Sequence, residues 1–547
     1  MSIPLRHLSP RGLALCIAAV SLTLATSCGG NDGRSRGHAL PDEILAVMSK
    51  PIYEKSSWGL RVVDVQSGEL IYDVNPDRNF LIGSVRKAFS VGLALDALGP
   101  DYRFQTPVHR RGTVDAAGVL DGDLILVASG DLSMGGRSNP DGSFAITDLD
   151  HNEANALGDA ELTAPDPLAG YRALATQIAA AGIRQVRGDV IVDERLWEPF
   201  DFRGEFNVSP IFVNDNVVDV AITPGATGSP ARVVSRPRSA AFEVQSTLAT
   251  GAAGSDVDVD LEPVLPRCVG SAPCAGAVSG SVPSDLVGPI RGRLPLVRTF
   301  RITDPAAYAR TVLIEALEAA GVVVDAPAVA PNAAAALPPQ ASYPVETRVA
   351  ELRSATYGDH AKHILKVSYN IGADTSLMYF GLTRGVRRVA DALAVERQKL
   401  ATDFGLDTSE MEFVDGSGGG LTRASNQAVT DLFQAMTRRP VYSDFREALP
   451  RLGLDGSLAT ITGFMSDPTL AGARGQVQAK TGTLAEGTEG GILIRGEAFG
   501  GYIRSRGGRD LAYQLVVNEV GPFADFGQIL SVIDDLGVVS ALIWREN

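Results

Sequence analysis

A serine and a lysine three residues apart, Ser84 and Lys87, open an apolar segment that runs to Leu98 and stops at Gly99-Pro100. A small polar residue at the start and a Gly-Pro stop are typical of a helix. Residues three apart lie on one face of a helix, so Ser84 can hand its hydroxyl proton to a neutral Lys87 amine. The pattern predicts a helix with a nucleophilic serine at its N-terminus. The alternative is an ordinary helix with a surface lysine.

Lysine is rare in this chain, which makes its position after Ser84 informative. Most of the 49 basic residues are arginine, and no lysine lies between Lys87 and Lys362. Arginine keeps its proton in proteins, whereas a desolvated lysine can act as a base. A lysine at this one place favours a chemical role for it.

Length and composition describe a folded, acidic protein of several domains. At 547 residues the chain is too long for one hydrophobic core, and roughly two to four domains are expected. Hydrophobic residues make up 45% and charged residues 21%, as in ordinary globular proteins. A formal net charge of −15 argues against nucleic acid as a partner.

The first residues predict export and lipidation. Arg6 and Arg11 precede an apolar run that is short for a membrane span. The run ends in Leu-Ala-Thr-Ser-Cys, which resembles a bacterial lipobox with Cys28 as the lipidated residue. We therefore expect a lipoprotein signal peptide over 1–28 and a tether over 29–39; the alternative is a plain signal peptide with an incidental cysteine. No further apolar segment is expected to reach the length of a membrane span.

The remaining cysteines predict one disulfide. Cys16 leaves with the signal peptide and Cys28 would carry lipid, which leaves Cys268 and Cys274. Two cysteines close together in a Pro/Gly-rich loop of an exported protein most often form a disulfide. A metal-binding pair is the alternative, but no histidine or other cysteine lies near them in the sequence.

The rest of the chain alternates between helix and strand patterns, which predicts an α/β fold. The expected helices mostly begin at a polar residue or at Asp-Pro, and several end at glycine. They are expected at 41–48, 166–182, 304–321, 361–367, 426–437 and 529–536. Strands are expected at 60–65, 69–72, 183–192, 322–324, 492–494 and 511–518.

Two further motifs follow in the second half of the chain. Ser-Tyr-Asn at 368–370 comes directly after an expected helix, and Lys-Thr-Gly-Thr at 480–483 lies in an extended segment. The patterns Ser-x-x-Lys, Ser-x-Asn and Lys-Thr-Gly each occur once, in this order. One match is weak, but the ordered triplet is typical of penicillin-binding proteins and serine β-lactamases.

Acyl transfer to a serine needs a base and a proton path to the leaving amine. Lys87 can serve as the base if burial and the neighbouring Lys480 cation lower its pKa. Ser368 is placed to relay a proton to the leaving nitrogen, and Asn370 to hold the substrate amide.

The reaction also needs groups that orient the substrate and stabilise the oxyanion. Lys480, Thr481 and Thr483 can bind a substrate carboxylate, while Gly482 lets its strand approach the serine helix closely. The backbone N–H groups of Ser84 and Thr483 are the expected oxyanion donors.

The chain resembles the low-molecular-mass class C penicillin-binding proteins of the D-alanyl-D-alanine carboxypeptidase/endopeptidase family. Besides the three motifs, the resemblance rests on stretches spread over nearly all of the mature chain: 98–104, 119–124, 188–193, 415–418 and 454–458. It implies an α/β penicillin-binding transpeptidase-like (serine β-lactamase-like) domain, with two further domains inserted between the first and second motifs. The implied limits are 40–104 and 356–547 for the catalytic domain and 105–355 for the insert, with about 130–212 nested inside it.

The resemblance also implies an activity. It is that of a serine DD-peptidase that cleaves the D-Ala-D-Ala terminus or D-Ala cross-links of peptidoglycan stem peptides through an acyl-enzyme on Ser84, without metal or cofactor. The implied catalytic residues are Ser84, Lys87, Ser368 and Asn370, and the implied substrate-binding residues are Lys480, Thr481, Gly482 and Thr483. The implied partners are peptidoglycan stem peptides and β-lactam inhibitors. With lipid on Cys28, the protein would be anchored to a membrane on the periplasmic side of a bacterial cell envelope.

Three departures from the family pattern bear on substrate preference. Ile82-Gly83 precedes the serine where Pro-Ala is usual, Tyr369 stands where Asp or Asn is frequent, and 485–498 resembles an insertion beside the active site. Two alternatives stay open: an envelope lipoprotein that binds peptidoglycan with a weak or inactive site, and a β-lactam-hydrolysing relative. The Glu-x-x-Asn pattern of a deacylating serine β-lactamase is not found in the sequence.

Other catalytic chemistries are not favoured. The chain has six histidines, so a Ser-His-Asp arrangement is not expected. His360 and His363 could share one helix face as metal ligands, but without an obvious third ligand they are expected to be solvated. The segment 148–159 loosely resembles a calcium loop, but Glu153 stands where a glycine is required, so a plain acidic loop is expected.

Overall fold

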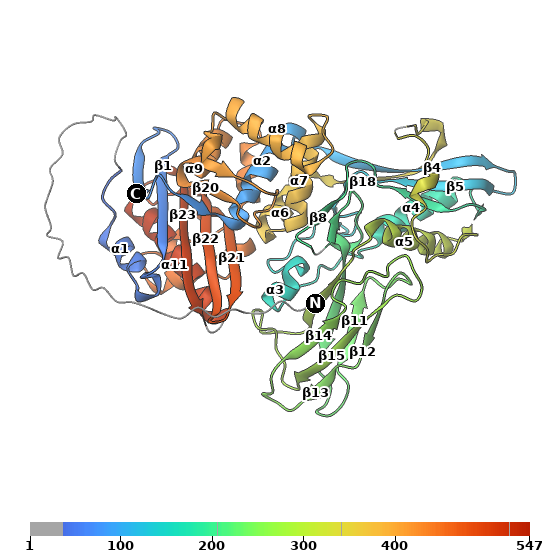
Figure 1. Ribbon diagram of the computed structural model, residues 1–547, viewed down its shortest axis with the longest axis horizontal. Helices are drawn as coiled ribbons and strands as arrows, with labels where there is room; N and C mark the ends of the chain where they lie inside the picture. Colours follow the sequence, from blue (N-terminus) through green and yellow to red (C-terminus); the bar gives the residue numbers. More distant parts are fainter. Residues whose placement is uncertain (1–36, 205, 341, 524–525) are drawn as a thin grey trace, which may run out of the picture. The chain divides into compact units, whose positions relative to one another are not determined.

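The computed structural model describes residues 37–204, 206–340, 342–523 and 526–547 (Figure 1). The predicted signal peptide 1–28, with the lipidation site Cys28, and most of the predicted tether 29–39 lie outside the described residues. The described chain is α/β throughout, as the sequence patterns predict.

A five-stranded antiparallel sheet carries the catalytic region, in the order β2-β1-β23-β22-β21. Its strands come from both ends of the chain: β1 (Ser57–Asp64), β2 (Leu70–Val74), β21 (Val477–Thr488), β22 (Gly491–Arg504) and β23 (Asp510–Phe523). Ser57 lies opposite Asn518, so the first and last strands are direct neighbours. Alternation of side chains gives this sheet two buried faces.

Helices cover both faces of this sheet (Figure 1). The C-terminal helix α11 (Phe526–Glu546) and α1 (Asp42–Met48) pack together on one face. On the other face lie α9 (Asn426–Met436) and the turn that opens α2 (Lys87–Leu98). The remaining helices of the region surround α2: α6 (Tyr357–Val367), α7 (Asn370–Leu382), α8 (Val389–Thr402) and α10 (Tyr442–Ala448).

Helix α11 is more apolar than the sequence analysis expected. Among the described residues, its segment Gly527–Glu546 is long and apolar enough to cross a membrane. The prediction that no further segment reaches that length was therefore wrong. The physical reason is packing: Val532, Leu536 and Val539 are fully buried against the sheet, and a long helix that covers a sheet needs an apolar face of matching length.

A six-stranded sheet forms the base of the inserted region, in the order β17-β6-β5-β4-β18 with β7 beside β5. Its strands are β4 (Arg103–Val114), β5 (Val119–Val127), β6 (Gln185–Val186), β7 (Val190–Asp193), β17 (Val323–Val324) and β18 (Arg348–Thr356). Two helices, α4 (Ala169–Ala180) and α5 (Pro305–Ala319), pack against each other. Asp304 caps α5 as predicted, whereas α4 begins after Asp166-Pro167 with Leu168 as its N-cap, so the predicted start of that helix was wrong. The strands that follow these two helices, β6 and β17, pair in parallel.

Two small sheets extend from this base. The first contains β10 (Val217–Thr223), β11 (Arg232–Arg236) and β16 (Leu296–Arg301). The second contains β12 (Glu243–Ser246), β13 (Ala249–Gly251), β14 (Asp258–Glu262) and β15 (Ala275–Pro283). The loop that leads into β15 is closed by the predicted disulfide, with Cys268 and Cys274 sulfurs 2.08 Å apart.

The sheet topology suggests where the domains should be divided. Arg103 at the start of β4 pairs with Thr356 at the end of β18, so the chain leaves and re-enters the catalytic region at one place. We propose the catalytic limits 40–104 and 356–547 on this ground. Within the expected nested range 130–212, strands β6 and β7 belong to the six-stranded base. We therefore propose 217–301, which builds two sheets of its own, as the nested unit.

Candidate active site

The first motif lies where β3 (Asn79–Leu81) runs into a 3₁₀ turn, Gly83–Arg86, that continues directly as α2. Lys87 is fully buried, and its Nζ lies 2.5 Å from Ser84 Oγ. Its Nζ also donates to Asn370 Oδ1 at 2.7 Å and to the Ser417 carbonyl at 2.9 Å. In the neutral amine the first contact reverses, and the Ser84 hydroxyl donates to nitrogen. The pair is therefore placed for proton transfer.

Two glycines let the serine turn touch strand β21. Gly83 has φ +48°, in the left-handed region that favours glycine. A Cβ on Gly482 would lie 2.1 Å from the Ile82 carbonyl oxygen, a distance that atoms cannot share. Gly83, which replaces the usual alanine, still packs against the backbone of β21. Gly482 allows the Lys-Thr-Gly strand to lie directly against Ser84, as the sequence predicts.

The second motif is the corner between two helices. Helix α6 ends at Val367, Ser368 takes the left-handed conformation (φ 62°, ψ 36°), and α7 begins at Asn370. This corner directs Ser368 and Asn370 to the lysines of the site. Tyr369 points the other way: its ring is buried, with its centroid 5.2 Å from that of His363. The unusual middle residue therefore packs in the core.

The third motif lies on β21, the edge strand of the catalytic sheet. Lys480 is fully buried, and its Nζ donates to Ser368 Oγ at 2.9 Å and to the Thr481 carbonyl at 2.7 Å. The Thr481 hydroxyl lies 2.8 Å from Ser457 Oγ, and Thr483 is exposed. Lys87 thus links the first motif to the second, and Lys480 links the second to the third.

Residues 485–498 are part of a long hairpin. Strands β21 and β22 stay paired from Val477 opposite Ile503 to Thr488 opposite Gly491, with one irregularity between Leu484 and Ala485. The expected insertion is therefore an extension of the two strands beyond the substrate-binding motif. The extra residues thus continue the β21–β22 hairpin past the substrate-binding motif.

Sequence motifs missed the loop 415–419, which completes the site around Lys87. Its Ser417 carbonyl accepts from Lys87, and its Gly416 N–H donates to Asp374 Oδ1 at 2.7 Å. The Ser90 hydroxyl on α2 donates to the Gly416 carbonyl at 2.7 Å. The segment 415–418 stood out only as a family-like stretch, because a backbone carbonyl that binds a lysine leaves no side-chain signature.

A buried ion pair between Arg86 and Glu396 also contacts this loop. Arg86 Nη2 lies 2.5 Å from Glu396 Oε2, with both side chains buried, and Arg86 Nε donates to the Asp415 carbonyl at 2.9 Å. Burial, with the Asp415 carboxylate nearby, raises the pKa of Asp374 to about 6. The Ser-x-x-Lys motif thus carries, in Arg86, its own connection to the loop that contacts Lys87.

A buried carboxyl lies behind the third motif. Glu497 is on β22 directly opposite Thr483 and is fully buried. Among the described residues, neither of its carboxyl oxygens makes a hydrogen bond of normal length and angle. Burial raises the pKa of Glu497 to about 8, with Thr483 and Lys480 acting in the opposite direction. Sequence reasoning gave no signal for it, since no motif includes this position.

The two histidines of α6 are buried, which corrects the prediction that they are solvated. His360 and His363 are 0% and 1% exposed, because the inserted region packs over their face of the helix: His360 Nε2 is 3.6 Å from Asp131 and His363 Nε2 is 3.5 Å from Asp150. Burial lowers the pKa of His360 to about 3, so it is neutral at physiological pH.

Asp150, Asp215 and His363 are close enough to share a metal ion, but cations of the chain already occupy the carboxylates. Arg137 donates to Asp150 at 2.9 Å and to Asp215, and His151 bonds Asp215 at 2.8 Å. Burial acts to lower the pKa of His151, but Asp219 and Asp150 raise it to about 10. The cluster is an ion-pair network between the inserted region and α6, and we assign no metal to it.

Asp148, Asp150 and Asp159 each contact a different part of the chain. Asp148 accepts from the Gly456 N–H at 2.7 Å, Asp159 pairs with Arg291 at 2.7 Å, and Asp150 binds Arg137. Each carboxylate therefore holds a separate part of the fold.

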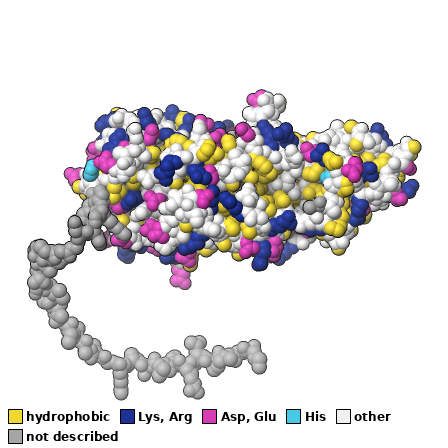
Figure 2. All heavy atoms as spheres, turned by 90° about the horizontal axis from the view of Figure 1, so that it is seen from above, with side chains coloured by type: hydrophobic (Ala, Val, Ile, Leu, Met, Phe, Trp, Pro, Cys, Tyr) yellow, Lys and Arg dark blue, Asp and Glu magenta, His cyan; other side chains and the backbone are white. Residues whose placement is uncertain are grey.

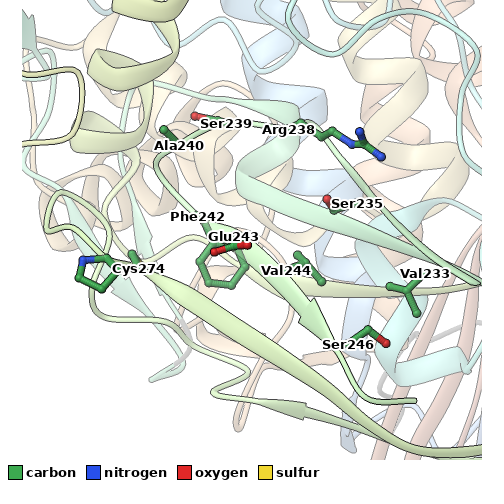
Figure 3. Close-up of a pocket in the computed structure, with 11 residues that line it drawn as sticks. Val233, Ser235, Arg238, Ser239, Ala240, Phe242, Glu243, Val244, Ser246 and Cys274 are labelled. Carbon is green, nitrogen blue, oxygen red and sulfur yellow. The ribbon is translucent and has the colours of Figure 1, made fainter. Parts of the chain in front are cut away.

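A separate pocket of about 480 Å³ lies in the inserted region, beside β11 and β12 (Figure 3). Its polar side chains are three serines, an arginine and a glutamate: Ser235, Ser239, Ser246, Arg238 and Glu243. Among its described lining residues there is no lysine or histidine that could activate a serine. This pocket therefore does not reproduce the serine–lysine pair found at Ser84.

Figure 2 shows how charged side chains are distributed on one face of the molecule. On the face shown in Figure 2, cationic and anionic side chains are interspersed among hydrophobic ones. Such mixing gives no extended field of one sign on that face.

Comparisons with known proteins agree with this geometry. The chain matches the model of the D-Ala-D-Ala carboxypeptidase 3 (S13) family over residues 40–529. It is 27% identical over 536 residues to the D-alanyl-D-alanine carboxypeptidase of Actinomadura sp. (strain R39), covering 92% of this chain and 85% of that protein.

A solved structure shares the fold. The chain superimposes on penicillin binding protein 4 (dacB) of Haemophilus influenzae with a TM-score of 0.66 and 16% identity, covering 92% of this chain and 98% of the other. The same protein in complex with a β-lactam gives a TM-score of 0.63 and 17% identity, with the same coverage.

Proposed function

This chain belongs to the D-Ala-D-Ala carboxypeptidase 3 (S13) family and is a serine-type D-Ala-D-Ala carboxypeptidase, and we propose that Ser84 is its nucleophile. The Ser84 oxygen attacks the carbonyl of the penultimate D-Ala, the terminal D-Ala leaves, and water then hydrolyses the ester. The observation that carries this proposal is the contact between Ser84 Oγ and the buried Lys87 Nζ.

Lys87 is the proposed base for the attack. As the neutral amine it takes the Ser84 proton while the new bond forms, and the resulting ammonium is held by Asn370 Oδ1 and the Ser417 carbonyl. These acceptors are in place before the reaction, so they stabilise the new charge without reorganisation. The backbone N–H groups of Ser84 and Thr483 are the proposed oxyanion donors, supported by the close approach of Gly482 to the serine turn.

Ser368 and Lys480 are the proposed route for the proton to the leaving amine. Lys480 donates to Ser368 Oγ, so the Ser368 proton can pass to the departing nitrogen while Lys480 gives one of its own protons to the Ser368 oxygen, which ends the step as a hydroxyl. Asn370 accepts from Lys87 through its amide oxygen, and its amide nitrogen is the proposed donor to a substrate carbonyl.

Lys480, Thr481 and Thr483 are the proposed site for the terminal carboxylate of the substrate. A buried ammonium and two hydroxyls on an edge strand offer the charge and donors that a carboxylate needs. A carboxypeptidase requires such a site, because its substrates end in a free carboxylate at the residue that leaves.

The substrates are peptidoglycan stem peptides, and β-lactams are the expected inhibitors. The family places the enzyme in the cell envelope, and the complex of the Haemophilus protein with a β-lactam supports binding of the same class here. We further propose that the enzyme also cuts D-Ala cross-links. We propose that 1–28 is cleaved as a lipoprotein signal and that lipid on Cys28 anchors the enzyme on the periplasmic side of a membrane.

The test is intact mass after incubation with penicillin, with the adduct mapped by peptide digestion. One penicillin added on Ser84, and none in Ser84→Ala, is the expected result. An adduct on another residue, or no adduct and no release of D-Ala, would overturn the assignment. Rapid loss of the adduct would instead identify a β-lactam-hydrolysing enzyme. For the anchor, Cys28→Ser is expected to move the protein from the membrane to the soluble fraction.

A further inference from the structure

The inserted region reaches the active site through one short hairpin. Strands β8 (Phe200–Phe202) and β9 (Phe206–Val208) pair with each other, and Arg203 follows at the end of β8. Arg203 has φ +54°. Residues other than glycine rarely adopt this backbone conformation, and those that do are often found at functional sites. The arginine is thus held in an unusual backbone state at the tip of the hairpin.

Arg203 makes two hydrogen bonds to the loop that contacts Lys87. Its Nη2 donates to Asp415 Oδ2 at 3.0 Å and to Ser417 Oγ at 2.7 Å. Ser417 is the residue whose carbonyl accepts from Lys87 at 2.9 Å. Arg203 and the proposed base Lys87 therefore both hydrogen-bond to the same residue, Ser417.

The guanidinium of Arg203 packs against an aromatic ring and against a glycine of the loop. It lies over the Phe202 ring, with Cζ 4.6 Å from the ring centroid. A Cβ on Gly419 would lie 2.2 Å from Arg203 Nε, so the glycine backbone packs directly on the guanidinium. Such a planar site suits arginine and not lysine, which offers a point charge on a flexible stem.

Arg203 supplies the positive charge that pairs with the Asp415 carboxylate of the loop. Asp415 Oδ1 accepts from the N–H groups of Ser417 and Gly418 at 3.0 and 2.6 Å, which shapes the loop from within. Its second oxygen accepts from the Gly419 N–H and from Arg203 Nη2, each at 3.0 Å. Burial alone would raise the pKa of Asp415, but Arg203 and the Gly418 N–H lower it, so the loop is built on a charged carboxylate.

We propose that Arg203 is a positioning residue for the peptidase reaction, and that through it the inserted region forms part of the active site. By holding Asp415 and Ser417, Arg203 keeps the Ser417 carbonyl at the distance that the Lys87 ammonium needs during acylation. The proposal rests on the proposed roles of Ser84 and Lys87. It predicts an effect on the rate of acylation and not on the affinity of the first, noncovalent complex.

The test compares Arg203→Ala and Arg203→Lys with the full-length wild type. Acylation by a fluorescent penicillin is followed over a range of concentrations, which separates the rate constant of acylation from the dissociation constant of the first complex. Arg203→Ala is expected to lower the acylation rate constant about 10- to 100-fold with an unchanged dissociation constant, the scale for misplacing a catalytic group by about an ångström. Arg203→Lys is expected to recover only part of the rate.

A matched control is available at the same boundary. Arg388 pairs with Glu198 of the inserted region at 3.4 Å, with both side chains largely exposed. Arg388→Ala removes a surface arginine that links the two regions without touching loop 415–419, and it is expected to keep the wild-type rate. Thermal unfolding of all variants shows whether the fold is intact.

Each outcome bears on a different claim. A wild-type acylation rate constant in Arg203→Ala, with the adduct on Ser84, overturns the positioning role. A raised dissociation constant at an unchanged rate constant also overturns it and makes Arg203 a substrate-binding residue. If the wild type itself carries no adduct on Ser84, the proposed function fails first, and that result is seen without any Arg203 variant.

Discussion

Lys480 Nζ donates to Ser368 Oγ at 2.9 Å, and the two residues are 112 positions apart in the chain. With the contact between Lys87 and Asn370, this bond brings the three motifs into one site. The side-chain nitrogens of two buried lysines thus both contact the second motif. This arrangement lets one lysine take the serine proton while the other supports the hydroxyl that releases a proton.

Lys87→Arg is expected to abolish acylation while the protein stays folded. Arginine keeps a positive charge near Asn370 and Ser417 but does not give up its proton, so Ser84 loses its base. We expect the acylation rate to fall by about 10²- to 10⁴-fold, the usual contribution of a general base. Stopped-flow or gel-based labelling with fluorescent penicillin measures this. A rate within a few-fold of the wild type would mean that another group is the base.

Gly482→Ala is expected to separate β21 from the serine turn. The new Cβ would meet the Ile82 carbonyl oxygen at 2.1 Å, so the strand must move and the oxyanion donors move with it. We expect about 100-fold slower acylation, read by the same labelling assay. Gly487→Ala on the same strand is the control, since nothing lies within 4 Å of its added Cβ. Equal rates in both variants would contradict the close-approach argument.

Glu497→Gln is expected to stabilise the fold at neutral and alkaline pH. The folded pKa of Glu497 is about 8, above its ordinary value of 4.5. The stabilisation from keeping this carboxyl neutral is therefore full below pH 4.5 and is lost as the pH rises toward 8. Glutamine stays neutral throughout, so the gain should be absent at pH 4 and reach the order of a few kcal/mol by pH 8.

Urea unfolding of wild type and Glu497→Gln at pH 4, 6 and 8 measures this difference. Glu486→Gln, on the exposed end of the same hairpin, is the control and should show no pH-dependent gain. A Glu497→Gln difference that is constant with pH would show that the carboxyl is already ionised in the folded protein.

Glu396→Gln is expected to destabilise the protein by about 3–5 kcal/mol, because it leaves the buried Arg86 cation without its partner. Arg86→Met together with Glu396→Leu removes both charges, and much of the lost stability should return. Urea unfolding measures both. The exposed pair Arg388–Glu198 serves as the control, and Glu198→Gln should change little. A small effect of Glu396→Gln alone would show that water reaches the Arg86 site.

The sequence was most informative where function requires a particular side chain. Ser84, Lys87 and the two later motifs were identified from residue type, spacing and order, and the structure brings them together. The role of Gly482 followed from its size. Tyr369 shows the limit of such reasoning: a position inside a motif gives no sign of which way its side chain turns at a helix corner.

Other features were outside the reach of a single sequence, for definite physical reasons. The Ser417 carbonyl acts through the backbone, which every residue carries. Arg203 comes from an inserted hairpin, and only the tertiary fold sets it against Ser417. His360 and His363 looked like surface residues because the partner surface that buries them is contributed by the insertion, through Asp131 and Asp150.

The pairing of β1 with β23 determines when this enzyme can first act. A chain emerging from a ribosome presents Ser84 early and the strands β21, β22 and β23 last. The strands of the inserted sheets all come from the middle of the chain, so these sheets can fold before the active site around Ser84 is complete. Reactivity toward penicillin should therefore arise abruptly, once the final hairpin has docked, and any nascent chain that stops short of β21 should be inert.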